Sequence, residues 1–142
     1  MIPKIKQMLL RLAEANEGVN GYRMAAGVVY KKTLLSTGVN HKKTHPIMLN
    51  DGYRDKQVYL HAEADAIKNA LRLVPQSTLV KSDIYVVRLK KDPRGNTYEG
   101  LAKPCAGCMN LIIQYGLKGV YWTNDEDICY HRKEWSRPSS NS

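Results

Sequence analysis

In the second half of the chain, helical patterns and short apolar runs alternate, and this order most restricts the fold. Helices are predicted over residues 61–74 and from Pro104 to about Gly116. The runs at 84–89 and 120–122 are typical of short buried strands. Strands that alternate with helices usually pair in parallel, because right-handed crossovers place the helices over the faces of the sheet. The sequence therefore predicts a layered α/β domain with parallel pairing in this half.

The first half predicts one helix followed by a β-hairpin. Apolar residues recur at helical spacing from Ile2 to Leu12, and Gly18 ends the pattern. Residues 25–30 and 33–39 are short, apolar and rich in β-branched side chains, and two lysines join them. The predicted order is helix, two strands, helix, strand, helix, strand.

The length of 142 residues fits a single domain. We expect this domain to cover residues 1–135 and a polar tail to cover 136–142. Residues 40–58 are polar and are predicted to form a loop, and a loop of this length in a compact domain is usually functional. No apolar run approaches the ~20 residues needed to span a bilayer, and no secretory signal is recognisable, so a cytoplasmic location is expected.

The chain is basic, with a formal net charge of +9. Such a charge favours a phosphorylated or polyanionic partner. The lysines and arginines are scattered along the sequence, however, so charge alone does not distinguish such a partner from an ordinary basic surface.

Two short segments carry residues suited to bind a metal ion. His61 begins one predicted helix, and Cys105 and Cys108 follow Pro104 at the start of another. Cysteines at positions i and i+3 lie on one helical face, so both sulfurs can reach a single ion. The positive end of the helix favours their thiolates. With one histidine nitrogen from the facing helix, they make three ligands and leave one position open, as in a catalytic zinc site.

Glu63 is predicted to be the catalytic group. It lies two residues beyond His61, too close in sequence for both side chains to share the ion comfortably. A carboxylate beside a zinc-bound water can take its proton and deliver it to the base and the leaving ammonia. The chain matches the pattern H-x-E…P-C-x-x-C, the signature of zinc nucleobase deaminases, at every fixed position.

With these motifs the chain resembles the zinc-dependent cytidine and deoxycytidylate deaminase superfamily, and deoxycytidylate deaminases most of all. Residues 61–66 are similar to their H-A-E-x-x-A run, although Asp65 stands where they commonly have Asn. The resemblance implies a three-layer α-β-α fold with a central mixed sheet. The resemblance also implies zinc as the cofactor. It implies that His61, Cys105 and Cys108 bind the zinc ion and that Glu63 carries the proton, and these are the same residues that the spacing indicates.

Four residues are candidates for substrate binding. Asn40, just after the second strand, matches an asparagine that contacts the substrate sugar in several branches of the superfamily, although it is also a common turn residue. Ala62 lies inside the H-A-E motif. Arg23 is a candidate for binding a phosphate or for anchoring the first strand. Tyr121, like its neighbour Trp122, either stacks on a base or belongs to the core or the rim of the pocket.

The predicted activity is hydrolysis of dCMP to dUMP with release of ammonia. The alternative is a cytosine or adenine deaminase that acts on single-stranded DNA or RNA. The predicted partners are a nucleotide and a second copy of the chain in a homo-oligomer, with no membrane. A structural zinc site would need a fourth ligand such as Cys129 or His131, and a zinc-stabilised binding module would have no need of Glu63.

Overall fold

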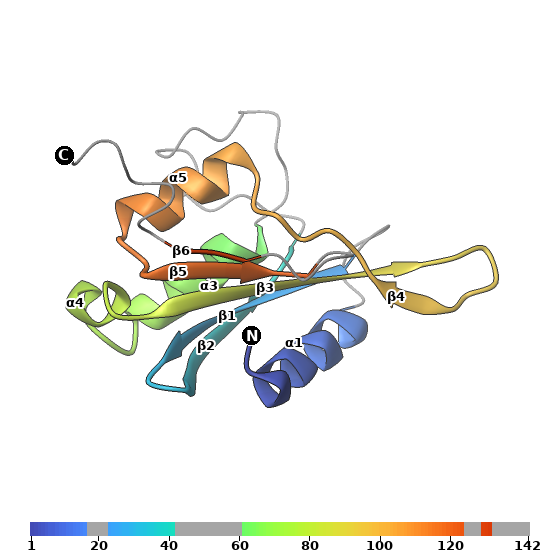
Figure 1. Cartoon of the computed structure of the whole chain (residues 1–142), viewed down its shortest axis with the longest axis horizontal. Coiled ribbons are helices and arrows are strands. Elements are labelled where there is room, and N and C mark those ends of the chain that lie inside the picture. Colours follow the sequence, from blue (N-terminus) through green and yellow to red (C-terminus); the bar gives the residue numbers. More distant parts are fainter. Residues whose placement is uncertain (17–22, 42–60, 124–128, 132–142) are drawn as a thin grey trace.

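The computed structural model describes residues 1–16, 23–41, 61–123 and 129–131. These residues form a mixed sheet with helices on both of its faces (Figure 1). The elements are α1 (Pro3–Ala15), β1 (Arg23–Tyr30), β2 (Thr33–Val39), α3 (Ala62–Leu71), α4 (Gln76–Leu79), β3 (Asp83–Lys91), β4 (Thr97–Glu99), α5 (Ala106–Gln114), β5 (Gly119–Trp122) and β6 (Cys129–His131).

The strand order confirms the mixed sheet that the sequence predicts. Five strands follow the order β2-β1-β3-β5-β6, and β4 pairs with β3 beside this path. β1 is antiparallel to β2 and to β3, whereas β3 and β5 are parallel and are joined through α5. The predicted hairpin is also confirmed. Its turn residues, Lys31 and Lys32, have φ values of 49° and 66°, and positive φ at both central residues is the requirement of a type I′ turn.

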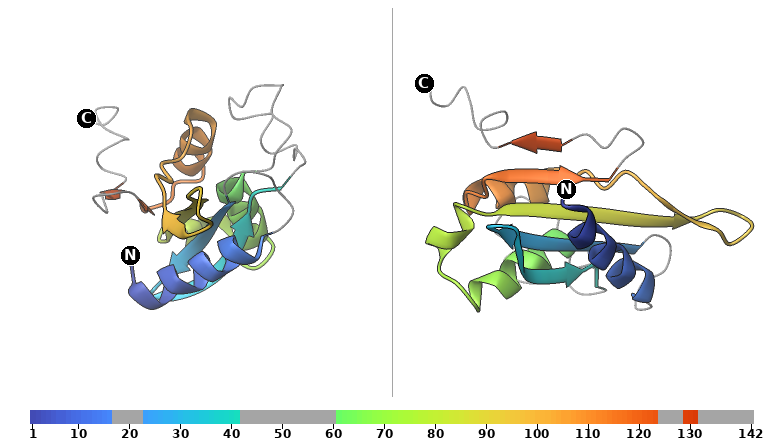
Figure 2. Two further views of the ribbon diagram at one scale, coloured as in Figure 1. Left: turned by 90° about the vertical axis from the view of Figure 1, so that its right-hand side faces the viewer. Right: turned by 60° about the horizontal axis from the view of Figure 1, so that its bottom comes forward.

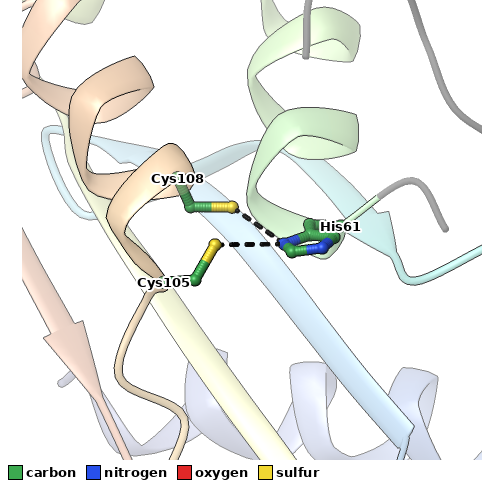
Figure 3. A group of neighbouring side chains, drawn as sticks. All are labelled: His61, Cys105 and Cys108. Carbon is green, nitrogen blue, oxygen red and sulfur yellow. Dashed lines mark hydrogen bonds between the residues drawn. The ribbon is translucent and has the colours of Figure 1, made fainter. Parts of the chain in front are cut away.

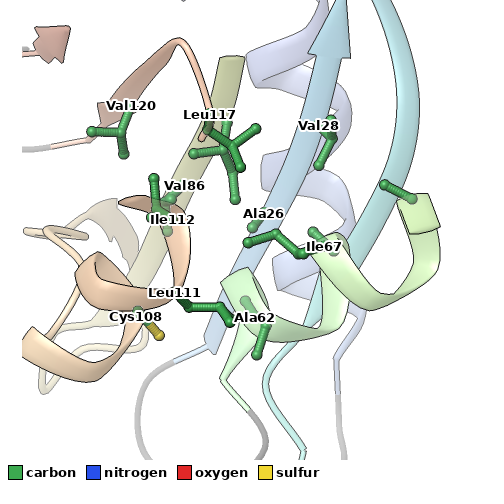
Figure 4. Close-up of a cluster of buried hydrophobic side chains, with 14 of the residues drawn as sticks. Ala26, Val28, Ala62, Ile67, Val86, Cys108, Leu111, Ile112, Leu117 and Val120 are labelled. Atoms are coloured by element: carbon green, nitrogen blue, oxygen red, sulfur yellow. The ribbon is translucent and has the colours of Figure 1, made fainter. Parts of the chain in front are cut away.

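The helices form two layers around the sheet (Figure 2). α1 packs on one face and buries Ile5, Leu9 and Ala13 there. α3 and α5 cover the other face and build the larger core (Figure 4). The fully buried side chains of this core include Ala26, Val28, Ile67, Ile84, Val86, Leu111, Ile112 and Val120. The α-β-α layering implied by the family resemblance is therefore confirmed.

A glycine brings β2 into close contact with α3. A Cβ atom at Gly38 would lie 2.3 Å from the backbone nitrogen of Ala66 and 2.6 Å from the carbonyl oxygen of Ala62. The Ser36 hydroxyl donates to the Ala66 carbonyl at 2.8 Å, and the Asn69 amide donates to the Thr37 carbonyl at 2.8 Å. β2 thus determines where the first two turns of α3 lie, because only a residue without a side chain fits between them.

The structure differs from the sequence prediction in its short elements. The predicted helix over 61–74 is shorter as α3, and α4 follows it after Pro75. The strands β4 and β6 were not predicted, since three residues are too few to show a strand pattern. Most of the predicted loop at 40–58, and the predicted tail at 136–142, lie outside the described residues. No helix in the described ranges is long and apolar enough to cross a membrane.

Candidate active site

The N-termini of α3 and α5 bring the predicted metal ligands together. His61 is the N-cap residue of α3 and Cys105 is the N-cap residue of α5, and both have extended backbones. Cys108 lies in the first turn of α5. Their ligand atoms all lie within 4.8 Å of one another, and His61 points toward both cysteines (Figure 3). Side chains far apart in the sequence are thus neighbours because two helices begin at the same edge of the sheet.

The geometry of these three side chains fits a zinc ion. The Nδ1 atom of His61 lies 3.3 Å from the Sγ atom of Cys108 and 3.5 Å from the Sγ atom of Cys105. In a tetrahedral zinc site, with Zn–S bonds of ~2.3 Å and Zn–N bonds of ~2.0 Å, a ligand nitrogen and a ligand sulfur are about 3.5 Å apart. Cys108 is buried and Cys105 is exposed, so solvent reaches the group from the side of Cys105.

The charges at the group favour metal binding. Hydrogen bonds with Cys108 and with His61 lower the pKa of the Cys105 thiol to about 4, although burial opposes this shift. Burial alone would lower the pKa of His61, but the hydrogen bond with Cys105 and the charge of Glu63 outweigh it, so the pKa of His61 is raised. Cys105 is therefore a thiolate at neutral pH, the form that binds metal ions.

Glu63 lies beside the ligand group, in the first turn of α3, and only 2% of its surface is exposed. Burial raises the pKa of its carboxyl to about 6, while the charge of His61 and a hydrogen bond with Cys108 oppose this rise. A carboxyl with a pKa near 6 can both accept and return a proton near neutral pH. Its burial and its neighbours suit a group that transfers protons.

Asn40 lies at the end of β2, next to the first turns of α3, and is buried. Its side-chain oxygen accepts hydrogen bonds from the backbone nitrogen of Met24 and from the side-chain amide of Asn16, both at 3.0 Å. The preceding residue, Val39, donates its backbone N–H to the carboxylate of Asp65 at 3.1 Å. Asn40 therefore stands at the same edge of the sheet as the turn that carries Glu63.

The other three candidate substrate contacts lie in different surroundings. Arg23 donates to the carbonyl of Glu14 at 2.5 Å. The sequence left two roles open for Arg23, anchoring the first strand and binding a phosphate, and this contact fits the anchoring role. Ala62 is fully buried in the core between α3 and α5 (Figure 4). Tyr121 packs on the opposite face of the sheet, against the cluster that α1 covers, with its ring centroid 5.5 Å from that of Tyr85.

The position of Tyr121 favours the core or rim role over stacking on a base, the two alternatives that the sequence left open. Successive residues of a strand point to opposite faces, so Tyr121 faces α1 while Trp122 belongs to the core beneath α3 and α5. A base bound at the ligand group would lie on the α3 and α5 side of the sheet. Tyr121 packs on the other face of the sheet, against the cluster that α1 covers.

Two groups of polar contacts near the site, one around Asp65 and one around Asn16, were not predicted from the sequence. Asp65 accepts hydrogen bonds from the Val39 backbone and from Nε2 of His41, each at 3.1 Å, and lies 3.4 Å from Nζ of Lys68. Asn16 contacts Asn40 across a separation of 24 residues. No sequence signal marks the contacts of Asp65 with Val39 and His41, or that of Asn16 with Asn40, because these residues are 24 or 26 positions apart and this separation follows no helix or strand period. The pair of Asp65 and Lys68, in contrast, has the i, i+3 spacing of a helix.

Comparison with known proteins agrees with this geometry. The family model of the cytidine and deoxycytidylate deaminase zinc-binding region matches residues 3–124. The chain therefore belongs to this family and is a deaminase of the zinc-dependent type, with zinc as its cofactor. No curated relative matches the sequence.

Two solved structures of dCMP deaminase from the cyanophage S-TIM5 are similar to this chain. Both are 22% identical to it and match over 87% of its length. The apo form has a TM-score of 0.51 and is covered over 86% of its own chain. The form in complex with dCMP and dUMP has a TM-score of 0.56 and is covered over 84%. At this identity the likeness supports the fold.

Proposed function

We propose that this protein deaminates a free cytosine nucleotide, with dCMP as the substrate and dUMP and ammonia as the products. The observation that carries the proposal is the position of the buried Glu63 carboxyl beside the group formed by His61, Cys105 and Cys108. Three metal ligands and one proton-transferring carboxyl are what hydrolytic deamination of a nucleobase requires.

In this proposal each residue of the group has a separate role. His61, Cys105 and Cys108 hold the zinc ion, through Nδ1 and the two sulfurs. Zinc, when bound, supplies Lewis-acid activation of water near neutral pH. Glu63 takes one proton from the attacking water and delivers it to N3 of the base, and it then takes the second proton from the added hydroxyl and delivers it to the departing amine. The water oxygen bonds to C4 of cytosine, the bond between C4 and the exocyclic nitrogen breaks, and ammonia leaves.

The choice of a mononucleotide rests on two supports. The similar cyanophage enzyme was solved with dCMP and dUMP bound. The basic residues of this chain are scattered along the sequence rather than gathered in one run, which favours a ligand with one phosphate over a polynucleotide. Asn40 is our proposed contact to the sugar, because it lies at the edge of the sheet where the turn with Glu63 begins.

The second candidate is deamination of a base within single-stranded DNA or RNA. The net charge of +9 favours it, since polynucleotide binding depends on phosphate contacts. Its salt dependence distinguishes it from the first candidate. For single strands, log affinity falls with log salt at a slope of about −0.7 per phosphate contact, so a polynucleotide enzyme would lose kcat/KM steeply, and a mononucleotide enzyme only weakly.

The test is the rate of ammonia release from cytidine, dCMP, dCTP and a cytosine-containing single-stranded oligonucleotide, each at low and moderate salt. We expect the highest kcat/KM with dCMP and a shallow decline with salt. Faster turnover of the oligonucleotide, with a steep loss as salt rises, would replace the first candidate with the second. An inactive protein with bound zinc would reject both.

A further inference from the structure

The hairpin of β3 and β4 extends beyond the rest of the sheet and leads back to the metal ligands (Figure 1). After β4 the chain crosses the end of β5, where the backbone nitrogen of Ala102 donates to the carbonyl of Thr123 at 2.9 Å. The hydroxyl of Thr123 donates in turn to the carbonyl of Gly100 at 2.7 Å. Cys105, the N-cap residue of α5, follows shortly after. The hairpin is thus an arm attached to the edge of the sheet where the candidate active site lies.

The strand register shows which side chains share one face of this arm. Val86 of β3 lies in the core beneath α3 and α5, and successive residues alternate, so Arg88 and Lys90 point to that face as well. Tyr98 is directly opposite Lys90 in the ladder and therefore shares its face. A Cβ atom at Gly100 would lie 2.6 Å from Cδ of Lys90 and 3.4 Å from Cδ of Arg88, so both stems lie together. We call Arg88, Lys90 and Tyr98 the hairpin face.

Basic side chains outnumber acidic ones along the arm, and the acidic ones are engaged. Glu99 is opposite Leu89, on the other face, and pairs with Nζ of Lys6 at 2.9 Å. The Asp92 carboxylate accepts hydrogen bonds from backbone N–H groups of the turn, at 2.9 Å. Residues 88–103 hold five basic residues against these two: Arg88, Lys90, Lys91, Arg94 and Lys103. The hairpin face is therefore complementary to a polyanion.

Tyr98 gives the hairpin face a second property. The residue is 49% exposed, although it stands directly beside a lysine in the ladder. An exposed aromatic ring can stack on a nucleic-acid base, and cations beside it can hold the neighbouring phosphates. This combination binds single strands, because the bases of a duplex are already stacked on one another. It favours single-stranded nucleic acid over other polyanions.

The segment that follows the hairpin continues this surface to the metal ligands. Exposure alternates along residues 100–105: Leu101 is 55% exposed, Ala102 is 1% exposed, and Lys103 and Cys105 are exposed. Residues two apart in an extended segment point to the same side, so Lys103 and Cys105 share the outward side. Lys103 thus adds a positive charge between the hairpin face and the open side of the ligand group.

We propose that the hairpin face and Lys103 bind a single strand of DNA or RNA, with Tyr98 stacked on a base and the cations on neighbouring phosphates. The inference goes beyond the proposed function, because deamination of a free nucleotide needs no such surface. The basic residues are scattered along the sequence, and the register of β3 and β4 gathers some of them on one face. The inference concerns binding and does not require the bound strand to be deaminated.

The test measures binding of a fluorescent oligothymidylate to the zinc-loaded protein by anisotropy. This strand contains no cytosine, so turnover does not enter the measurement. Tyr98→Ala should raise Kd roughly 5- to 100-fold, as the loss of one stacked base does, and Tyr98→Trp should retain binding. Lys90→Gln should lower the slope of log Kd against log salt by about 0.7, the value of one phosphate contact.

The matched control is Lys91→Gln, which removes the same charge from the opposite face of the same strand. It should change Kd by less than about twofold at moderate salt, because its distance from the bound strand leaves it screened. Equal effects of Lys90→Gln and Lys91→Gln, together with unchanged binding in Tyr98→Ala, would show general charge attraction and overturn the proposal. Equally tight binding of a DNA duplex or of polyglutamate would overturn it too.

Ammonia release from dCMP separates this inference from the proposed function. A protein that binds oligothymidylate as described but does not deaminate dCMP would support the binding surface and reject the proposed substrate. A protein that deaminates dCMP but does not bind the strand at low salt would reject the binding surface alone.

Discussion

The Nδ1 atom of His61 lies 3.3 Å from the Sγ atom of Cys108, although 47 residues separate them in the chain. His61 stands at the N-terminus of α3, and Cys108 is fully buried in the first turn of α5. A metal ion bound between them would join the two helices that cover this face of the sheet. The free energy of metal binding would then also stabilise the folded state against unfolding.

The first prediction concerns the ligands. Cys108→Ala, and separately Cys105→Ala, should reduce zinc content far below one ion per chain, because each change leaves only two of the three ligands. Each should also lower the melting temperature of the purified protein. Elemental analysis and a thermal scan measure the two effects.

The control for these variants is Cys129→Ser, which changes the remaining cysteine of the sequence and should keep the zinc. Retention of one zinc per chain in Cys105→Ala or Cys108→Ala would contradict the ligand set.

The second prediction concerns the stability of the metal-free protein. The pKa of Glu63 rises from 4.5 to about 6 on folding, so the folded state favours the neutral carboxyl. Ionisation of Glu63 therefore lowers the free energy of unfolding. This loss develops as pH rises from about 4.5 to about 6, and it persists above that range. Glu63→Gln keeps a neutral side chain of the same shape. It should stabilise the chelator-treated protein by about 2 kcal/mol at neutral pH.

Urea unfolding at about pH 4 and about pH 7.5 checks this prediction. At the lower pH the carboxyl is largely protonated in both states, so the parent and Glu63→Gln should differ little. A variant less stable than the parent at the higher pH would show that the ionised carboxylate stabilises the fold, contrary to the stated cause of the shift.

The third prediction concerns the contact between β2 and α3. Gly38→Ala should destabilise the protein by ~1–3 kcal/mol, because the added Cβ meets backbone atoms that cannot move alone. Activity should also fall, since the stretch of α3 that must shift carries Glu63. In the control, Gly27→Ala, the atoms nearest to the added Cβ are the side-chain ends of Leu34 and Leu9. Equal losses of stability in the two variants would contradict this account of Gly38.

The predicted parts of the site are those whose geometry is local. The i, i+3 spacing of Cys105 and Cys108 places both sulfurs on one helical face wherever that helix lies. His61 and Glu63 are only two residues apart, so both stand at the start of the same helix. Together with the alternation of strands and helices, this spacing sufficed to predict the ligand group. The layers of the fold followed from the same alternation and the family resemblance.

The parts that sequence reasoning missed depend on contacts between distant segments. Strand alternation shows that Tyr121 and Trp122 face opposite ways, but it does not show which of them faces the site. The pair of Asn16 and Asn40 has no sequence pattern, because a helix end and a strand end meet there only after the domain has folded. Short edge strands such as β4 form because a neighbour offers hydrogen bonds, whatever their own propensity.

The most direct test of the central claim is ammonia release from dCMP by the zinc-loaded protein and by its Glu63→Gln variant. We predict that both bind equal amounts of zinc and that the variant loses turnover by ~10²–10⁴-fold or more, because an amide can neither accept the water's proton nor return it. A variant that released ammonia at the parent's rate would contradict the role of Glu63, and with it the proposed mechanism.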